Sequence, residues 1–350
     1  MSAPVNLDDR LPKAGTPAFA LGLGLTNECN LACDFCYRDA SRVDRLSLQQ
    51  VRSVMQRLPV RSVNLGTGEN GLHPDFLAIL QYLRMQPIKL TMTTNGYSVA
   101  CIADADLVAF KDIEFSLDYP SQAEQDHQRG SGNWQLLHEQ AARCRRLGVP
   151  VTFIAVMMQS NYDRLADVAA IARAYDAPLR INVYQSVRTD KYALTYAQYW
   201  AGFERLFERT DVIAIGEPLI RAAAGLPPPS GGCGVATVRV TPRATVQPCV
   251  YWPGGGAPLD ILLDAGPDIV TTKSFTEARS LPEACSSCVH VAACRGGCAG
   301  RRRLMGALAE PDPYCSIARG EDRRLRIQQT EAREMPKLES ACTTIVIARG

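Results

Sequence analysis

The amino-acid sequence predicts an α/β protein, a TIM-like partial (β/α)6 barrel followed by a small cysteine-rich domain. First, short apolar, strand-like runs alternate with helical patterns from about residue 18 to residue 210. Such alternation implies a parallel sheet with right-handed crossovers, and six units are too few for a closed eight-stranded barrel. Second, the sequence becomes proline- and glycine-rich near residue 216, which indicates a boundary. Third, cysteines are dense beyond that boundary.

Each predicted strand is a short run of mostly apolar residues. The six runs span 19–25, 62–66, 88–93, 112–117, 151–157 and 179–184. The helices between them carry terminal signals: Ser47 is suited to cap one helix, and Pro74 lies in the favoured first turn of a helix over 74–85. A further helix, over 133–148, ends with a glycine.

The second half of the chain is less regular. Residues 235–252 are predicted to form a hairpin with its turn near Pro242–Ala244. Residues 317–335 have a charged helical pattern, and residues 341–350 are predicted to contain a last strand. These features divide the chain into an N-terminal extension (1–17), the barrel (18–215), the cysteine-rich domain (216–318) and a C-terminal helix and tail (319–350).

The bulk composition is ordinary for a globular protein, with 46% hydrophobic residues, 21% charged residues and a formal net charge of +2. That balance gives no basic footprint for nucleic acid and no polybasic membrane anchor. No apolar run approaches the ~20 residues of a spanning helix, and the N-terminus lacks the charged start and apolar core of a signal peptide. We therefore expect a cytoplasmic protein with no nucleic-acid or membrane partner.

Thirteen cysteines are unusual for such a protein. A reducing cytoplasm does not keep structural disulfides, so this number of thiols indicates metal or redox chemistry. Three cysteines lie at 29–36 and seven lie between 233 and 315, whereas Cys101, Cys144 and Cys342 stand apart. The distribution suggests two separate metal-bearing regions.

The first group is the C-x3-C-x2-C array of Cys29, Cys33 and Cys36. It directly follows the first predicted strand, at the edge where barrel active sites lie. Three thiolates on a short loop can bind three irons of a 4Fe–4S cluster and leave the fourth iron without a protein ligand. An open position binds and activates another molecule, whereas structural metal sites usually fill every position. A zinc knuckle and incidental buried thiols are the alternatives.

This array resembles that of the radical S-adenosylmethionine (SAM) superfamily, in which an aromatic residue, here Phe35, precedes the third cysteine. The resemblance implies that the amino and carboxylate groups of SAM chelate the open iron. One electron from the cluster then cleaves SAM, and the resulting 5′-deoxyadenosyl radical abstracts a hydrogen atom from the substrate. A reductant such as flavodoxin or ferredoxin is an implied partner.

Further motifs match the same family in order along the chain. The Gly66–Glu69 segment resembles the Gly-Gly-Glu motif that receives the SAM amino group, although Thr67 replaces the first glycine of that motif. An arginine in the family pairs with the SAM carboxylate, as suits a guanidinium. The resemblance predicts SAM contacts by Phe35, Gly68, Glu69, Asn95, Ser116, Asp118 and Arg129. Asn182 is a further predicted SAM contact, because of its position in the sixth predicted strand.

The C-terminal cysteines resemble the seven-cysteine SPASM domain, which binds two auxiliary 4Fe–4S clusters. The family's pattern assigns Cys233, Cys249 and Cys298 to the first of these. It assigns four cysteines to the second: Cys285, Cys288, Cys294 and Cys315. With the SAM cluster, three 4Fe–4S clusters are implied. A pair of structural zinc sites is the alternative for this region.

Two details depart from the SPASM pattern. Ala244 stands where the family usually has glycine, so we expect a turn that is built differently. The first auxiliary cluster is one ligand short, because the stretch LPPPSGG before Cys233 lacks the eighth cysteine that some relatives carry there. An open iron, a water or a non-cysteine ligand would complete the cluster, and an open iron would be a substrate-binding site.

The resemblance leaves three uses of the radical open. Modification of a ribosomally made peptide by cross-linking, oxidation or epimerisation is favoured by two auxiliary clusters, which provide an exit for the substrate's second electron. Oxidation or rearrangement of a small metabolite, such as an aminosugar, is the second reading, and a non-catalytic electron carrier is the third. Only 28 residues precede Cys29, so a peptide's leader would be bound by residues 317–350 or by a separate leader-binding protein. Val250 follows Cys249 where sulfatase-maturating enzymes carry an aspartate, which disfavours formylglycine formation.

Several aromatic and polar side chains are weaker candidates for substrate contact, each about as suited to packing. They are Tyr119, Tyr184, Gln185, Arg188 and Trp252. Cys342 is a candidate hydrogen-atom donor, and an isolated cysteine is also suited to a buried apolar position.

Overall fold

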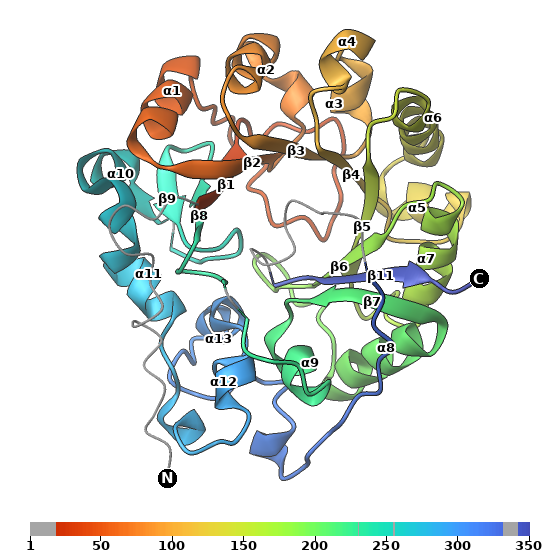
Figure 1. Ribbon diagram of the computed structural model, residues 1–350, viewed down its shortest axis with the longest axis vertical. Helices are drawn as coiled ribbons and strands as arrows, with labels where there is room; N and C mark the ends of the chain where they lie inside the picture. The colour runs from red at the N-terminus through yellow and green to blue at the C-terminus, as the bar shows by residue number, and fades with distance from the viewer. Residues whose placement is uncertain (1–18, 230, 255, 332–341) are drawn as a thin grey trace.

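The structure is a computed structural model that describes residues 19–229, 231–254, 256–331 and 342–350. An 11-stranded sheet runs in the order β10-β9-β8-β1-β2-β3-β4-β5-β6-β11-β7. The sheet curves around a central interior, and the helices lie on its outer side (Figure 1). The predicted α/β barrel is therefore confirmed, and the predicted N-terminal extension (1–17) lies outside the described residues.

Six consecutive parallel strands form the barrel wall, as the apolar runs predict. They are β1 (Phe19–Gly24), β2 (Val60–Gly66), β3 (Lys89–Thr94), β4 (Asp112–Ser116), β5 (Val151–Met157) and β6 (Leu179–Val183). The helices that return the chain between strands are α1 (Leu48–Arg57), α2 (Phe76–Arg84), α3 (Tyr97–Ala100), α4 (Asp104–Leu107), α5 (Gln122–Arg129), α6 (Asn133–Arg146), α7 (Leu165–Arg173) and α8 (Tyr196–Arg209). Ser47 caps α1 in a capping box, whereas α2 begins two residues after Pro74.

The barrel strands alternate between an apolar outer face and a polar inner face. On β3, Leu90 and Met92 belong to the hydrophobic core under the helices. The intervening Thr93 donates a hydrogen bond to Glu114 on β4 over 2.6 Å. Glu114 also forms an ion pair with Arg180 on β6 (3.2 Å), and both side chains are at most 2% exposed. Period-two alternation thus places charged and hydroxyl groups inside the barrel.

The far edge of the barrel is completed by two strands. One is β7 (Thr210–Ile215), which the sequence did not predict, and the other is β11 (Thr344–Ala348), which confirms the predicted last strand. β11 lies between β6 and β7 and runs antiparallel to both. It therefore covers the edge that a six-stranded sheet would leave unpaired.

At the other edge, the predicted hairpin is confirmed as β8 (Thr237–Val240) and β9 (Thr245–Gln247). β8 pairs with β1, and the short strand β10 (Ala257–Pro258) pairs with β9. The sheet is thus continuous across residue 216, although the sequence changes character there. The turn of the hairpin keeps a backbone conformation that favours glycine, because Ala244 adopts a left-handed φ of 55°.

Replacing Ala244 by glycine is expected to raise the free energy of unfolding by up to about 1 kcal/mol. A left-handed conformation costs a residue with a Cβ roughly 1–2 kcal/mol, and the greater freedom of glycine in the unfolded chain offsets part of that gain. Urea unfolding of the two proteins checks this. The matched control is Ala142→Gly in the middle of α6, where glycine should lower stability by roughly 0.5–1 kcal/mol; equal effects of the two changes would contradict the assignment of strain.

The cysteine-rich region is built from short helices: α9 (Pro218–Ala223), α10 (Leu259–Ala265), α11 (Lys273–Ala278), α12 (Val291–Cys294) and α13 (Ala299–Leu304). The prediction of a helix over 317–335 is wrong for the residues described. After a single 3-10 turn (Ile317–Arg319), Gly320 turns the chain at φ 77°. The backbone then bonds to its neighbours in space, with Val212 N–H donating to the Gln328 carbonyl (2.7 Å). Residues 332–335 of that stretch lie outside the described residues.

A buried ion network fixes this region to the barrel. The Arg301 guanidinium donates to the carboxylates of Glu217 (2.8 Å) and Asp312 (2.7 Å), and all three residues are at most 4% exposed. The rings of Tyr199 and Tyr314 stack with centroids 4.3 Å apart, and the guanidinium lies 4.8 Å from the Tyr314 centroid. Within the described part of the chain, no helix is both long and apolar enough to cross a membrane.

Candidate active site

Cys29, Cys33 and Cys36 lie on the loop between β1 and α1, and all three line a cavity of about 260 Å³. The Cys29 sulfur accepts hydrogen bonds from the Leu31 backbone N–H (3.4 Å) and the Asn95 side-chain amide (3.6 Å). Donors of this kind stabilise thiolates that bind iron. Three sulfurs that line one cavity fit a cluster whose fourth iron faces that cavity.

The turn after β2 is pressed against this cysteine loop. A Cβ built on Gly68 would lie 2.4 Å from the carbonyl oxygens of Thr26 and Glu28, so no side chain fits there. The Glu69 N–H donates to the Glu28 carbonyl over 2.7 Å. Thr67, which replaces a glycine of the motif, takes a left-handed φ of 71°, and its hydroxyl bonds to that of Tyr37 (3.0 Å).

Replacing Gly68 by alanine is expected to reduce SAM cleavage at least tenfold and to destabilise the fold by about 2 kcal/mol. The new Cβ combines a positive-φ penalty with overlap against two carbonyl oxygens, and it moves the turn away from the cysteine loop. Release of 5′-deoxyadenosine and thermal unfolding measure the two effects.

Gly132→Ala is the matched control for this change. Gly132 also has a positive φ (80°), yet nothing lies within 4 Å of its Cβ position. Its replacement introduces the backbone penalty without the overlap. Similar losses of SAM cleavage in both variants would contradict the role given to the Gly68 contact.

Hydrogen bonds inside the protein hold the Glu69 carboxylate in place. It is 1% exposed and accepts hydrogen bonds from the hydroxyls of Thr94 and Ser98 and from the backbone N–H groups of Asn95 (2.9 Å) and Ser98 (2.8 Å). Burial raises the pKa of Glu69 even though these donors favour its ionised form. The carboxylate therefore joins the turn after β2 to the loop after β3.

Asp118 and Arg129 form a second buried unit. The Arg129 Nε donates to Asp118 over 2.7 Å, and the other oxygen of Asp118 accepts the Val156 N–H at 2.8 Å. Arg129 lines the cavity, with its guanidinium 5.3 Å from the ring centroid of Phe35. Asp118 is 0% exposed and does not line the cavity. Asp118 thus holds Arg129, and Arg129 faces the space beside the cysteines.

The other predicted SAM contacts lie at the carboxyl ends of the barrel strands. The predicted residues that share the cavity with the three cysteines are Phe35, Gly68, Glu69, Asn95, Ser116, Arg129 and Asn182. Tyr184 and Gln185 also line it, whereas Trp252 lines a second cavity. Tyr119 packs in a small cluster with Phe35, and Arg188 donates to the Arg38 carbonyl (2.8 Å).

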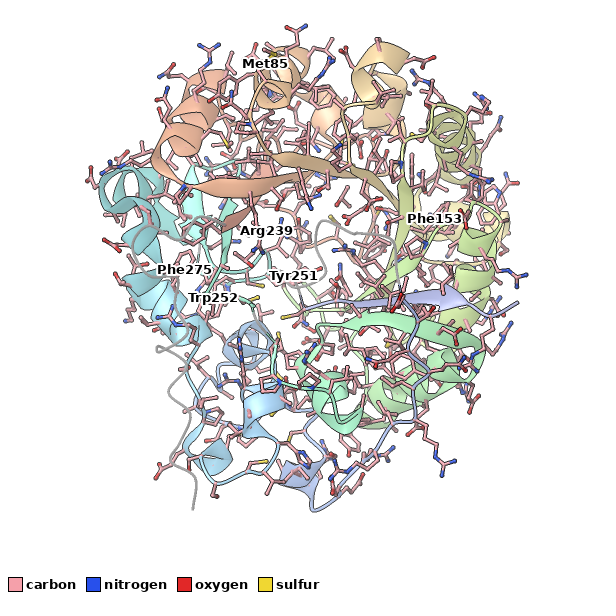
Figure 2. All side chains as sticks on the ribbon, in the orientation of Figure 1. Met85, Phe153, Arg239, Tyr251, Trp252 and Phe275 are labelled. Carbon is pink, nitrogen blue, oxygen red and sulfur yellow. The ribbon has the colours of Figure 1, made fainter. Side chains whose placement is uncertain are left out.

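Arg239 and Tyr251 line the same cavity, and sequence reasoning did not select them. Both side chains lie toward the interior enclosed by the sheet (Figure 2). Arg239 reaches there because it crosses β1 at Gly22, where a Cβ would lie 2.0 Å from its Nη1. Tyr251 packs edge-on against Tyr37 at 5.2 Å. A glycine inside a strand often indicates such an approach, and the LGLG pattern of β1 was the available signal.

The C-terminal cysteines lie in two groups in the structure. Cys233, Cys249 and Cys298 line the 260 Å³ cavity and also a second cavity of about 400 Å³, so they lie in the wall between the two. Cys285, Cys288, Cys294 and Cys315 lie within electrostatic reach of one another. Among the described residues, no three His, Cys, Asp or Glu side chains converge as they would on one metal ion.

Comparisons with known proteins agree with this site. A family model described as the radical SAM superfamily matches residues 23–172. The chain is 30% identical over 320 residues to mycofactocin maturase MftC of Mycolicibacterium smegmatis, covering 83% of this chain and 81% of that protein. It is 24% identical over 348 residues to PqqA peptide cyclase of Gluconobacter oxydans, covering 88% of this chain and 93% of that protein.

Solved structures agree in fold. The structure of anSMEcpe with bound AdoMet and the Cp18Cys peptide superposes with a TM-score of 0.67 at 17% identity, covering 87% of this chain and 95% of that one. SuiB of Streptococcus suis gives a TM-score of 0.63 at 16% identity, covering 85% and 77%. Since the match to mycofactocin maturase covers more than four fifths of both chains, this protein belongs to the radical SAM superfamily.

Proposed function

We propose that this protein modifies a ribosomally made peptide by radical chemistry, through a cross-link, an oxidation or an epimerisation. The observation that carries the proposal is the single cavity in which the three cysteines of the radical SAM motif meet the cysteines of the C-terminal region. A relative that matches along both regions is named a maturase, and another a peptide cyclase. These names favour a peptide over a small metabolite as the substrate.

Different residues around the cavity would bind the cluster and the different groups of SAM. When bound, the 4Fe–4S cluster and SAM supply a 5′-deoxyadenosyl radical, which abstracts a hydrogen atom from the substrate. Cys29, Cys33 and Cys36 would hold the cluster, and Arg129 would bind the SAM carboxylate in a charge-assisted pair. Asp118 keeps Arg129 charged and oriented from beneath. The turn at Gly68 would bring its backbone close to the SAM amino group.

The polar contacts of SAM would come from the other strand ends. Asn95 is held beside Cys29 by its bond to that sulfur. Ser116 ends β4, and Asn182 lies on β6 across the cavity. We assign Asn182 to the SAM ribose and Phe35 to packing against the guanidinium of Arg129. These side chains orient SAM, while the surrounding strands exclude water from the radical.

The two groups of C-terminal cysteines would hold auxiliary 4Fe–4S clusters, giving three clusters in all. The first would use Cys233, Cys249 and Cys298, which face the same cavity as SAM. The second would use Cys285, Cys288, Cys294 and Cys315. A substrate that loses a hydrogen atom and then a second electron needs an acceptor, and these clusters are suited to pass that electron to a soluble carrier.

Two kinds of protein partner follow from the same proposal. SAM cleavage needs one electron, so a flavodoxin or ferredoxin would supply it. A precursor peptide would be held by its leader, either by the chain itself or by a separate leader-binding protein. Both partners fit the cytoplasmic location that we propose for this protein.

The test is an anaerobic assay with SAM, a strong reductant and candidate precursor peptides. We expect 5′-deoxyadenosine to form and the peptide mass to change. Deuterium should pass from one labelled residue of the peptide into 5′-deoxyadenosine. Transfer of deuterium from a small metabolite, with every peptide unchanged, would contradict a peptide substrate; absence of SAM cleavage under all conditions would contradict radical catalysis altogether.

A further inference from the structure

A fourth cysteine lies with the three assigned to the first auxiliary cluster. Cys342 lines both the 260 Å³ and the 400 Å³ cavities, as Cys233, Cys249 and Cys298 do. These four cysteines, which we call the wall cysteines, come from three distant parts of the sequence. They therefore converge through the fold rather than through local spacing.

Strand β11 brings Cys342 to this wall. β11 is antiparallel to the barrel strands, and its first residue, Thr344, pairs with Ile215 at the carboxyl end of β7. The Thr343 carbonyl accepts the Gly216 N–H at 2.6 Å, and Thr343 itself lines the cavity. The start of an antiparallel strand lies where parallel strands end, so Cys342 arrives at the edge that carries the SAM site.

The sulfur atoms of the wall cysteines lie close together. The Sγ atoms of Cys233 and Cys342 are 3.8 Å apart. The sulfurs of Cys249 and Cys298 both lie beside Gly300, at 3.7 and 3.8 Å from the position of a Cβ built on that glycine. The Tyr251 and Arg301 N–H groups donate to the sulfurs of Cys249 and Cys298, both over 3.4 Å. Four thiols, two of which accept backbone N–H donors, form a set that fits an iron–sulfur cluster.

We propose that Cys342 is the fourth thiolate ligand of the first auxiliary cluster, completing Cys233, Cys249 and Cys298. The inference rests on the proposed auxiliary clusters and replaces the open iron expected from the sequence. The Cys342 thiol loses its proton as its sulfur binds the remaining iron. A cluster with four thiolates offers no iron to the substrate, so its role becomes electron transfer.

The position of Cys342 also argues against its role as a hydrogen-atom donor. A hydrogen-atom donor must keep a free thiol, because a thiolate bound to iron has no hydrogen atom to give. Cys342 instead lies against another cysteine of the set and in the wall that both cavities share. Cys101, which is exposed, and Cys144, which is buried in α6, lack these neighbours and serve as references.

The experiment uses a background in which Cys29, Cys33 and Cys36 are alanine, so that only auxiliary iron remains. The background should hold about eight irons per chain, as two four-iron clusters. Adding Cys342→Ala should lower that number by about one and produce the paramagnetic resonance signal of an oxidised three-iron cluster. Cys342→Ser, which supplies an oxygen ligand, should keep more of the iron than alanine does. Cys101→Ala is the matched control and should change nothing.

The outcomes distinguish a failure of the Cys342 assignment from a failure of the proposed auxiliary clusters. Iron content and spectra identical in the background and in its Cys342→Ala derivative overturn the role of Cys342 and leave the auxiliary clusters standing. A background with no iron overturns the auxiliary clusters and the role of Cys342 with them.

A measurement on the unaltered chain covers the case of a misfolded variant. In the iron-loaded protein, Cys342 should resist alkylation by iodoacetamide, as the other wall cysteines do. After chelation and reduction all four should react. Alkylation of Cys342 while the iron is bound, or a disulfide between Cys233 and Cys342 in the iron-loaded protein, overturns the proposal.

Discussion

Replacing Cys29, Cys33 and Cys36 together by alanine is expected to abolish SAM cleavage while the rest of the protein stays folded. The three thiols lie on a loop outside the strands and are only half buried, so their loss removes little packing. The iron content should fall by about four per chain, because one cluster loses all of its protein ligands. Production of 5′-deoxyadenosine and iron analysis measure the two effects.

The control for this variant is Cys144→Ser in α6, which removes a thiol that faces the core and not the cavity. It should retain both SAM cleavage and iron. SAM cleavage that persists in the triple alanine variant would contradict the assignment of the radical SAM site, whatever the state of the other cysteines.

Replacing Arg301 by methionine is expected to lower the free energy of unfolding by about 3–5 kcal/mol, the loss typical when one partner of a buried ion network is removed. Glu217 and Asp312 would then keep their negative charges in a buried site without a cation. Burial already raises the pKa of Glu217, and Arg301 opposes that shift. Without the arginine, Glu217 should take up a proton at a higher pH, so the destabilisation should be smaller below that pH.

Arg205→Met is the matched control, because Arg205 pairs with Asp163 on the surface and both side chains are at least 40% exposed. An exposed pair contributes about 0–1 kcal/mol. Chemical unfolding at equal cluster content compares the two variants. If both variants lose the same small amount of unfolding free energy, the network around Arg301 does not fasten the cysteine-rich region to the barrel.

The strands that form from local patterns were predictable, and those that depend on distant partners were not. The six barrel strands are apolar runs bounded by turn signals, which a short stretch of sequence reveals. β7 carries a weaker alternation and follows directly on α8, and its pairing partner β11 comes much later in the chain. The charged stretch after residue 317 has helical periodicity, yet its backbone bonds to residues such as Val212 and Ala223. Tertiary hydrogen bonds outweighed local preference there.

The residues of the site also differ in how far the sequence could reveal them. The spacing of Cys29, Cys33 and Cys36 is local, so the sequence reveals the array before any fold is known. Asp118 was expected to touch SAM, and the structure places it beneath Arg129, because burial depends on the packing of β4 and β5. Arg239 enters the cavity across Gly22, a contact between the first strand and the eighth.

The position of β11 has a consequence for the order in which the molecule is made. On the ribosome, residues 344–348 emerge after every other strand in the sheet, so β6 and β7 remain without their shared neighbour during most of translation. Pairings between such distant segments form slowly, and the exposed strand edges are open to aggregation until they are covered. We expect the nascent chain to depend on chaperones at this stage, and iron delivery to the wall cysteines to be among the last events of maturation.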